Sequence, residues 1–392
     1  MEKVFANKKD CSGCGVCAEH CPKNAITLKA DGFGFLYPEI DQKLCVDCGI
    51  CRNVCHMLNK NAAEKMAQRV VALKSKDPQV IKTSQSGGAF AELAKCVLEE
   101  SGVVYGAAFG AQFNVSHIRI DNMQELHRLQ GSKYVQSELT GIFREVKQDL
   151  EAQTQVLFSG TPCQVAALNA YLNKSYDNLF AVDVVCHGVM APQIWKDYIA
   201  YTRKKYGEFT QANFRDKAVG GWRGNSQSFR IKGEIKGFRT YGKLFNSNCF
   251  LRESCYTPEK SRIICKYGGL MRCSDLTIGD FWGIENVNSN IPDDNTGISV
   301  CLINSEKGEK LFAKIADSVI WEEHTLEDIN IKGKNPHFGE GDPYLSKKLK
   351  KARAGYLKKG FSYIAGKYAD LGFRGFCSKG MRFLKRCIRK NV

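Results

Sequence analysis

Two cysteine-rich runs near the N-terminus contain the residues best suited to chemistry. The first, "CSGCGVCAEHCP" at 11–22, separates its four cysteines by two, two and three residues, and "CVDCGICRNVCH" at 45–56 repeats this spacing 34 residues later. Thiolates at these intervals are typical of chains that bind two 4Fe-4S clusters, in which three closely spaced cysteines hold one cluster and the fourth ligates the other. The spacing therefore predicts an electron-carrying module.

The bacterial ferredoxin pattern crosses the two runs. It assigns the eight cysteines to a first set of Cys11, Cys14, Cys17 and Cys55 and a second set of Cys45, Cys48, Cys51 and Cys21. Structural zinc is the alternative, but zinc sites seldom repeat four cysteines so tightly. His56 replaces the proline that follows the first run, and we expect it to tune the cluster environment without being a ligand.

Composition sets the broad class of the protein. The chain has 392 residues, of which 43% are hydrophobic, enough for about two domains and a small module. It contains no apolar run long enough to cross a membrane, and its N-terminus lacks the hydrophobic stretch of a secretory signal, so we expect a cytoplasmic protein. In that reducing compartment, 18 cysteines indicate metal or redox chemistry in place of disulfides.

The elements that must position these residues form an α/β pattern after a polar connector at 59–68. Between the cysteine runs, alternation around Asp31-Gly32 predicts a hairpin. Further along, we expect strands at 69–75, 103–110, 155–160 and 179–185, a helix at 87–102, and a strand followed by a helix at 296–316. The fold class is thus a small ferredoxin-like α+β module followed by an α/β domain with a mixed sheet.

Three small polar loops near strand ends are candidate ligand sites. They are "SQSGG" at 84–88, "GSKY" at 131–134 and "SGTPCQ" at 159–164. Glycine and hydroxyl residues before a helix offer free backbone amides to phosphate, although such loops are also common as plain helix caps. The sequence has neither a G-x-G-x-x-G dinucleotide fingerprint after a strand nor a G-x-x-x-x-G-K-[ST] loop.

The remaining cysteines are numerous enough for a third four-thiolate site. Cys163 and Cys186 each follow a predicted strand, and 249–273 adds Cys249, Cys255, Cys265 and Cys273. Cys163 and Cys186 are equally compatible with buried small side chains or a catalytic thiol. A Cys186–His187 hydrolase pair is poorly placed, because adjacent residues of a strand point to opposite faces.

Positive charge gathers in the C-terminal segment. Between Lys347 and Lys390 there are 15 Lys or Arg residues and one acid, so most of the net charge of +16 lies there and the body is nearly neutral. This distribution argues against a nucleic-acid-binding face over the fold. The interleaved aliphatic and aromatic residues are compatible with peripheral contact with an anionic membrane, or with a solvated tail or packing arm.

Together the motifs resemble the family of coenzyme F-420 hydrogenase/dehydrogenase beta subunits, in a form with an N-terminal double 4Fe-4S ferredoxin domain. The resemblance rests on "SQSGGAF", "GVVYGAAF", "GSKYVQS", "FSGTPCQVAAL", "VDVVCHGV", "NFRDK", "GWR" and "SDLTIGDFWG". It implies a ferredoxin-type domain at 1–60, a flavin domain at 61–340 and a basic amphipathic tail at 341–392. It also implies FAD beside a third 4Fe-4S cluster.

The family pattern supplies candidate residues for these cofactors. Third-cluster ligands would be Cys163, Cys186, Cys255 and Cys265, although here an insertion separates the last two, which leaves Cys249 and Cys273 as substitutes. Candidate FAD-binding residues are Ser86, Gly87, Gly88, Lys133, Ser159, Gly160, Thr161 and Trp282, with Lys133 and Asp280 as catalytic candidates.

The resemblance implies an oxidoreductase that passes electrons between its clusters and a small molecule docked on FAD, either a coenzyme F-420-like compound or a substrate of surface-polysaccharide metabolism. The alternative is an electron-relay subunit without a substrate of its own. Both functions imply a redox partner protein, either a ferredoxin or an oxidoreductase subunit.

Overall fold

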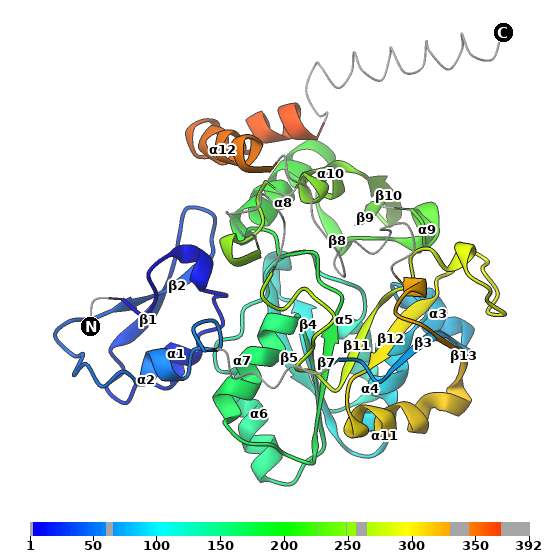
Figure 1. Ribbon diagram of the computed structural model, residues 1–392. Coiled ribbons are helices and arrows are strands. Elements are labelled where there is room, and N and C mark those ends of the chain that lie inside the picture. The colour runs from blue at the N-terminus through cyan, green and yellow to red at the C-terminus, as the bar shows by residue number, and fades with distance from the viewer. Residues whose placement is uncertain are drawn as a thin grey trace.

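A mixed eight-stranded sheet forms the centre of the computed structural model, which describes residues 3–59, 66–224, 226–247, 249–255, 265–329 and 345–369 (Figure 1). The strand order is β13-β3-β12-β11-β7-β6-β4-β5. The strands are β3 Arg69–Ser75, β4 Val103–Phe109, β5 Val115–Ile120, β6 Val156–Gly160, β7 Leu179–Val184, β11 Leu276–Asp280, β12 Ser299–Ile303 and β13 Val319–His324. The four middle strands β4, β6, β7 and β11 are parallel, and antiparallel strands flank them on both sides. The predicted α/β class with a mixed sheet is therefore confirmed.

Helices cover both faces of this sheet, which explains why its inner strands are apolar along their whole length. The helices are α3 Pro78–Thr83, α4 Ala89–Glu99, α5 Leu126–Leu129, α6 Ile142–Glu151, α7 Pro162–Leu172 and α11 Glu306–Ile315. Val104 of β4 packs with α4 and α11, while its neighbour Val103 packs with α6 and α7 on the opposite face. Because the parallel strands end at one edge, the loops that follow β6, β7 and β11 lie close together there.

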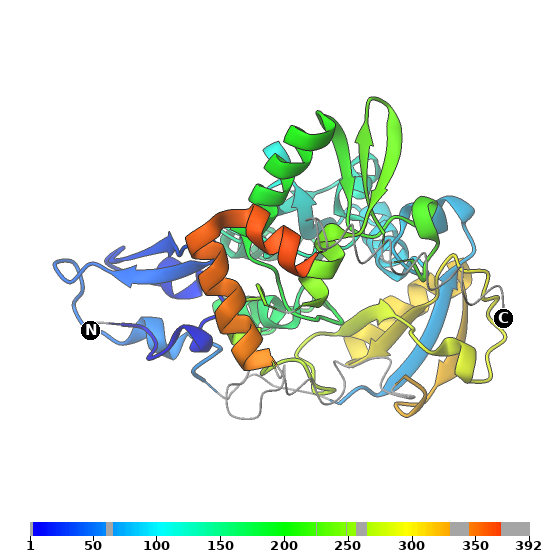
Figure 2. The ribbon, with the colours of Figure 1, turned by 90° about the horizontal axis from the view of Figure 1, so that it is seen from above.

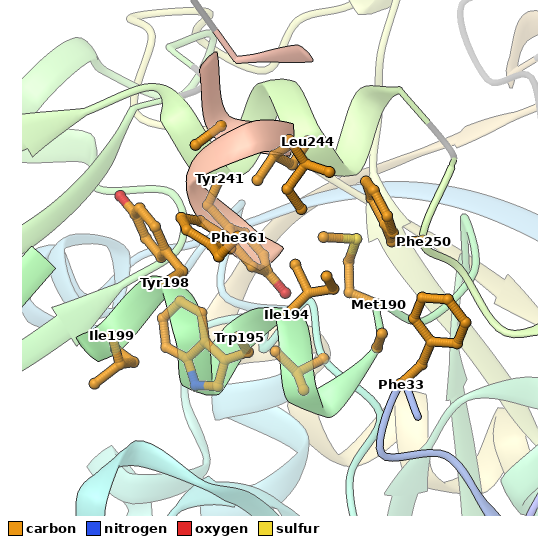
Figure 3. Packing of buried hydrophobic residues seen from close by; sticks show 14 of the residues in the cluster. Phe33, Met190, Ile194, Trp195, Tyr198, Ile199, Tyr241, Leu244, Phe250 and Phe361 are labelled. Atoms are coloured by element: carbon orange, nitrogen blue, oxygen red, sulfur yellow. The ribbon is translucent and has the colours of Figure 1, made fainter. Parts of the chain in front are cut away.

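A second layer lies in the long connection between β7 and β11, and the sequence patterns did not predict it. It contains α8 Pro192–Tyr206, β8 Phe209–Asn213, α9 Lys217–Gly220, β9 Gln227–Ile231, β10 Glu234–Phe238 and α10 Thr240–Asn246. The three strands form an antiparallel sheet in the order β10-β9-β8. Aromatic side chains fill the space between this sheet and α8, and Figure 3 shows Trp195, Tyr198 and Tyr241 among them.

The described part of the basic C-terminal segment is a packing arm. Helix α12, Leu345–Tyr368, bends at Gly360, whose φ of 72° favours glycine. Phe361 and Ile364 are buried against the second layer, and the Tyr356 hydroxyl donates a 2.7 Å hydrogen bond to Asp197 of α8. These contacts agree with the packing-arm alternative for α12, whereas peripheral membrane contact stays a prediction; residues 370–392 lie outside the described part.

The N-terminal module projects from one side of the molecule (Figures 1 and 2). It consists of α1 Val16–Glu19, β1 Ile26–Ala30, β2 Leu36–Ile40 and α2 Ile50–Asn53. The hairpin β1–β2 turns at Asp31, as predicted, and the Asp31 carboxylate accepts hydrogen bonds from the amides of Phe33 and Phe35. Phe33 then docks on the body: its carbonyl accepts a 3.0 Å hydrogen bond from the Gln193 amide, and its ring stacks on Tyr356 of α12.

Within the described ranges, no helix combines the length and apolar character that a bilayer span requires.

Candidate functional site

The eight N-terminal cysteines gather in the two sets that the ferredoxin pattern predicts. Burial is the largest cause of the raised pKa of Cys17, and the neighbouring thiols of Cys14, Cys11 and Cys55 raise it further. The second set lines its own small cavity of about 20 Å³, formed by Cys21, Cys45, Cys48 and Cys51 with their neighbours. Helix α1 carries Cys17 of the first run, and helix α2 carries Cys51 of the second run. Each helix is preceded by a glycine with positive φ, Gly15 before α1 and Gly49 before α2.

These two sets differ in exposure. Cys48 is exposed, and Leu44 and Val46 beside it leave 50% and 59% of their surfaces open. In the other set, burial raises the pKa of Cys14 to about 12. The second set therefore lies at the surface of the molecule, and the first set lies against the body.

A third group of thiols lines a cavity of about 210 Å³ between the module and the body. The group consists of Cys163, Cys186, Cys255 and Cys265, the four that the family pattern indicates, and Cys14 of the first set lies in the same wall. Cys163 lies in the first turn of α7, shortly after β6, and Cys186 follows the end of β7. The two substitutes do not line this cavity: Cys249 is buried nearby with its Sγ 3.3 Å from the Ser247 carbonyl, and the Cys273 Sγ faces the Pro162 carbonyl.

The donor chemistry of this third group fits an iron–sulfur cluster. Burial raises the pKa of Cys186 and of Cys255 to about 12, and neighbouring thiols contribute to both shifts. Four such thiols in one buried cavity require a cation to become thiolates together. No group of three or more His, Cys, Asp or Glu side chains in the described ranges is arranged to hold a single metal ion.

The cysteine-hydrolase alternative fits this geometry poorly. A nucleophilic cysteine needs a lowered pKa, whereas burial raises that of Cys186. Cys186 and His187 are consecutive residues in the cavity wall, and the groups that shift the pKa of Cys186 are the thiols of Cys163 and Cys265, the Gly188 amide and the Arg272 guanidinium.

A larger cavity of about 390 Å³ lies at the edge where the parallel strands end. Its lining includes eight of the residues predicted for FAD and catalysis: Ser86, Gly88, Lys133, Ser159, Gly160, Thr161, Asp280 and Trp282. Its volume falls in the usual range for small-molecule sites. The two cavities share a wall that includes Thr161, Cys186 and Gly188.

Gly87 is the exception among the predicted residues, because it does not line the cavity. A Cβ atom at Gly87 would lie 2.3 Å from the Leu73 carbonyl oxygen of β3 and 2.6 Å from the Ser299 amide of β12. Gly87 thus lets the loop lie flat on the sheet, and Gly88, with φ of 91°, begins α4. Together they bring the loop of Ser86 to the cavity wall.

Thr161 and Gln164 belong to a hydrogen-bond network in the wall of the cavity. Thr161 caps α7, and its amide donates a 2.8 Å hydrogen bond to Gln164 Oε1. Gln164 Nε2 donates to Ser137 Oγ, which lies 2.8 Å from His117 Nδ1, and His117 Nε2 lies 3.0 Å from the Ser159 carbonyl. Burial lowers the pKa of His117 to about 4, so the ring is neutral at pH 7 and its Nε2–H donates to Ser159.

Asp280 lines the cavity and holds two neighbouring side chains, while its catalytic role stays a prediction. Its carboxylate accepts a hydrogen bond of 2.5 Å from Arg215 and one of 2.6 Å from the Trp222 indole N–H. Trp222 stacks on Trp282 with ring centroids 4.9 Å apart, and the Arg215 guanidinium lies over Trp282. Asp280 therefore positions the aromatic wall of the cavity. The sequence motifs included Arg215 and Trp222, but only their contacts in the fold reveal this role.

Lys133 likewise acts on the protein in this structure. Its ammonium donates to the carbonyls of Arg128, Leu129 and Gln130 at 2.9 to 3.1 Å, the last carbonyls of α5. Burial lowers its pKa to about 7. These hydrogen bonds close the end of α5 beside the cavity, and the catalytic and flavin-binding role of Lys133 stays a prediction.

Comparisons with known proteins agree on the family. Residues 70–144 and 153–329 match the N-terminal and C-terminal parts of the family described as coenzyme F420 hydrogenase/dehydrogenase, beta subunit, and residues 10–58 match a 4Fe-4S dicluster domain. A subunit of the F(420)H(2) dehydrogenase of Methanosarcina mazei is 21% identical over 225 residues, which cover 52% of this chain and 63% of that protein. The chain therefore spans less than two thirds of the length of this relative.

Two further matches differ in how much of the chain they cover. A ferredoxin-like protein in the nif region of Rhizobium leguminosarum bv. trifolii is 36% identical over 63 residues, 14% of this chain and 88% of that protein. A solved F420-reducing [NiFe] hydrogenase complex from Methanosarcina barkeri, studied by xenon derivatization, matches 79% of this chain and 93% of its own chain at 15% identity, with a TM-score of 0.45.

The matched segments contain the N-terminal cysteine runs and all the strands of the central sheet. The chain belongs to the family of coenzyme F420 hydrogenase/dehydrogenase beta subunits and carries a 4Fe-4S dicluster domain.

Proposed function

We propose that this protein is an iron–sulfur flavoenzyme in which three 4Fe-4S clusters connect a redox partner to FAD and a small-molecule substrate. The observation that carries the proposal is the shared wall between the four-cysteine cavity and the larger cavity. A flavin exchanges a hydride equivalent with a substrate and single electrons with clusters, which is the chemistry that this arrangement needs.

The order of the thiol groups supports a single path for electrons. The second set, with Cys48, lies at the surface; the first set, with Cys14, follows, and Cys14 also lines the third cavity. The third cavity then adjoins the larger one through Cys186. Each thiol group thus neighbours the next, from the surface to the candidate flavin site.

Several side chains of the larger cavity fit FAD binding. The backbone around Ser86 and Gly88, at the start of α4, offers amides for a diphosphate, and the Thr161 loop lines the same cavity. Trp282, held by Asp280 and Arg215, forms an aromatic wall suited to a flat ring system. Lys133 keeps the loop of Gly131 and Tyr134 at the cavity by closing α5.

The exposed face of the second set is our proposed docking site for the redox partner. Leu44 and Val46 are apolar and exposed beside Cys48. Electron transfer favours short distances, so a partner that covers this face comes closest to the outermost thiols. The name of the Methanosarcina mazei relative supports a partner and a coenzyme F420-like substrate, because that relative is a subunit of an F(420)H(2) dehydrogenase.

Cofactor content of the full chain, purified and reconstituted without oxygen, tests the proposal. Three four-iron clusters correspond to about 12 iron atoms per chain. We expect that value together with one FAD, identified by its absorbance and by chromatography after release. About 8 iron atoms per chain without flavin would instead favour the electron-relay subunit, which has only the two ferredoxin-type clusters. Zinc as the sole metal would contradict both functions.

A further inference from the structure

One buried arginine lies between the two inner thiol groups. Arg252 is 1% exposed and belongs to the segment that also carries Cys255. Its Nε donates a 2.8 Å hydrogen bond to the Cys11 carbonyl, one terminal nitrogen donates to Gln136 Oε1 at 2.9 Å, and the other donates to the Leu36 carbonyl at 2.9 Å. The guanidinium therefore joins the ferredoxin module to the body.

Its charge also lies beside the thiols of both groups. The second terminal nitrogen is 3.6 Å from Cys11 Sγ, and Arg252 lines the cavity that contains Cys163 and Cys255. The same side chain is thus electrostatically close to candidate ligands of two clusters.

The chain is shaped to admit this side chain. A Cβ atom at Gly13 would lie 2.6 to 2.8 Å from the guanidinium atoms, so a residue larger than glycine there would displace Arg252. On the other side, the guanidinium lies 4.4 Å from the Tyr37 ring centroid and 5.3 Å from that of Phe35. Glycine and two aromatic rings form a slot for a planar cation.

Arg252 differs from three other buried or partly buried arginines in having no carboxylate partner within ion-pair distance among the described residues. Arg215 pairs with Asp280, Arg272 lies 3.5 Å from Asp183, and Arg353 pairs with Glu253. A buried cation without an anion is strongly unfavourable, and proteins seldom keep one unless something negative binds beside it. A 4Fe-4S cluster with four thiolates carries net negative charge, and it gains one more negative charge on reduction.

We propose that Arg252 is a positioning residue that serves as the shared counter-charge of the inner ferredoxin-type cluster and the third cluster. The part of this inference that concerns the third cluster rests on the proposed function; the part that concerns the inner ferredoxin-type cluster does not. A fixed buried cation stabilises the reduced form more than the oxidised form, so Arg252 raises the reduction potentials of both inner clusters relative to the outer one. Single electrons from a partner therefore move favourably from the outer cluster to the inner clusters. This transfer forms and breaks no covalent bond.

Three substitutions separate charge from hydrogen bonding. Arg252→Met removes both, Arg252→Gln keeps one amide donor without the charge, and Arg252→Lys keeps the charge without the planar fork. Arg353→Met is a matched control, because Arg353 anchors the same segment through the carbonyls of Cys249 and Leu251 and its Glu253 pair. The outer cluster, bound by the second set, is an internal reference in every sample.

The measurement is an EPR-monitored redox titration of the full-length, iron-loaded protein, with iron counted in each sample. In Arg252→Met we expect the reduced-to-oxidised ratio of the inner clusters at a fixed potential to fall at least about tenfold, which is about 59 mV for one electron. Arg252→Lys and Arg353→Met should stay within about threefold of the parent, and the outer cluster should not change.

Inner-cluster potentials that stay at the parental value in Arg252→Met and Arg252→Gln, with iron retained, would overturn the proposal. If the Met variant does not keep its iron, Arg252→Gln decides alone. If the parent has only two clusters, the third-cluster part of the proposed function fails, but the inner ferredoxin-type cluster still tests Arg252.

Discussion

At the residue scale, thiol placement separates cysteines that could hold a cluster from those that fill space. Cys255 and Cys265 line the third cavity, whereas Cys249 and Cys273 lie outside its wall. The family pattern alone left Cys249 and Cys273 as substitutes for Cys255 and Cys265, because an insertion interrupts the pattern between the latter two. Long loops cost little closure free energy, so an insertion can be accommodated between two ligands that remain together.

The substitution Cys265→Ser tests this assignment. We expect the iron content to fall from about 12 to about 8 atoms per chain, because a cluster that loses one of its four thiolates is lost or degraded. Cys249→Ser is the control: its side chain is buried outside the cavity wall, and we expect its iron content to equal that of the parent. The assignment fails if iron is lost from Cys249→Ser and retained in Cys265→Ser.

At the element scale, α12 fastens the ferredoxin module to the second layer. Tyr356 stacks on Phe33 of the hairpin and donates its hydroxyl hydrogen to Asp197 of α8. Arg353 reaches the segment that carries Arg252 and Cys255 through the carbonyls of Cys249 and Leu251. Figure 2 shows α12 lying between the module and the second layer. This helix therefore holds the inner thiol groups in register with each other.

Removal of an aromatic ring from α12 should weaken the fold. Phe361 is 8% exposed and packs against Tyr198 and Tyr201, so Phe361→Ala is expected to lower the free energy of unfolding by about 3 kcal/mol. Leu357→Ala on the same helix is the control: Leu357 is 61% exposed, and we expect a change within about 0.5 kcal/mol. Chemical unfolding of the purified variants measures both values, and similar effects for the two would contradict the packing role of α12.

At the scale of the whole molecule, the free energy of unfolding should depend on pH through the buried side chain of His117. Burial lowers the pKa of His117 to about 4 from an ordinary value of 6.5. Between those two values the unfolded chain binds a proton that the folded chain does not, so stability falls as the pH decreases through this window. The shift corresponds to about 3 kcal/mol once the pH is below both values.

A substitution isolates this contribution from other acid-sensitive groups. Glutamine in His117→Gln has no proton to gain, so its unfolding free energy should decrease less than that of the parent between about pH 7 and about pH 5. Urea unfolding at the two values provides the comparison. Equal decreases in parent and variant would show that His117 does not titrate in the window.

Local sequence patterns determined the cysteine sets, several strands and helices, and two of the cavity loops without reference to the tertiary structure. Cysteine spacing predicted the two thiol sets, because ligands within one short run are brought together by local turns. Apolar strand and helix patterns predicted β3, β4, β6, β7, α4 and α11. The loops of Ser86 and Thr161 were recognised for the same reason, since helix starts have local sequence signatures.

Only the tertiary structure decided what those residues do together. The pairing of Asp280 with Arg215 joins residues 65 positions apart, and the contact of Arg252 with Cys11 joins residues 241 positions apart. It also revealed that Lys133 caps α5 and that Gly87 packs on the sheet. A local pattern cannot predict such roles, because burial and the identity of a charge's neighbour depend on which distant segments the fold brings together.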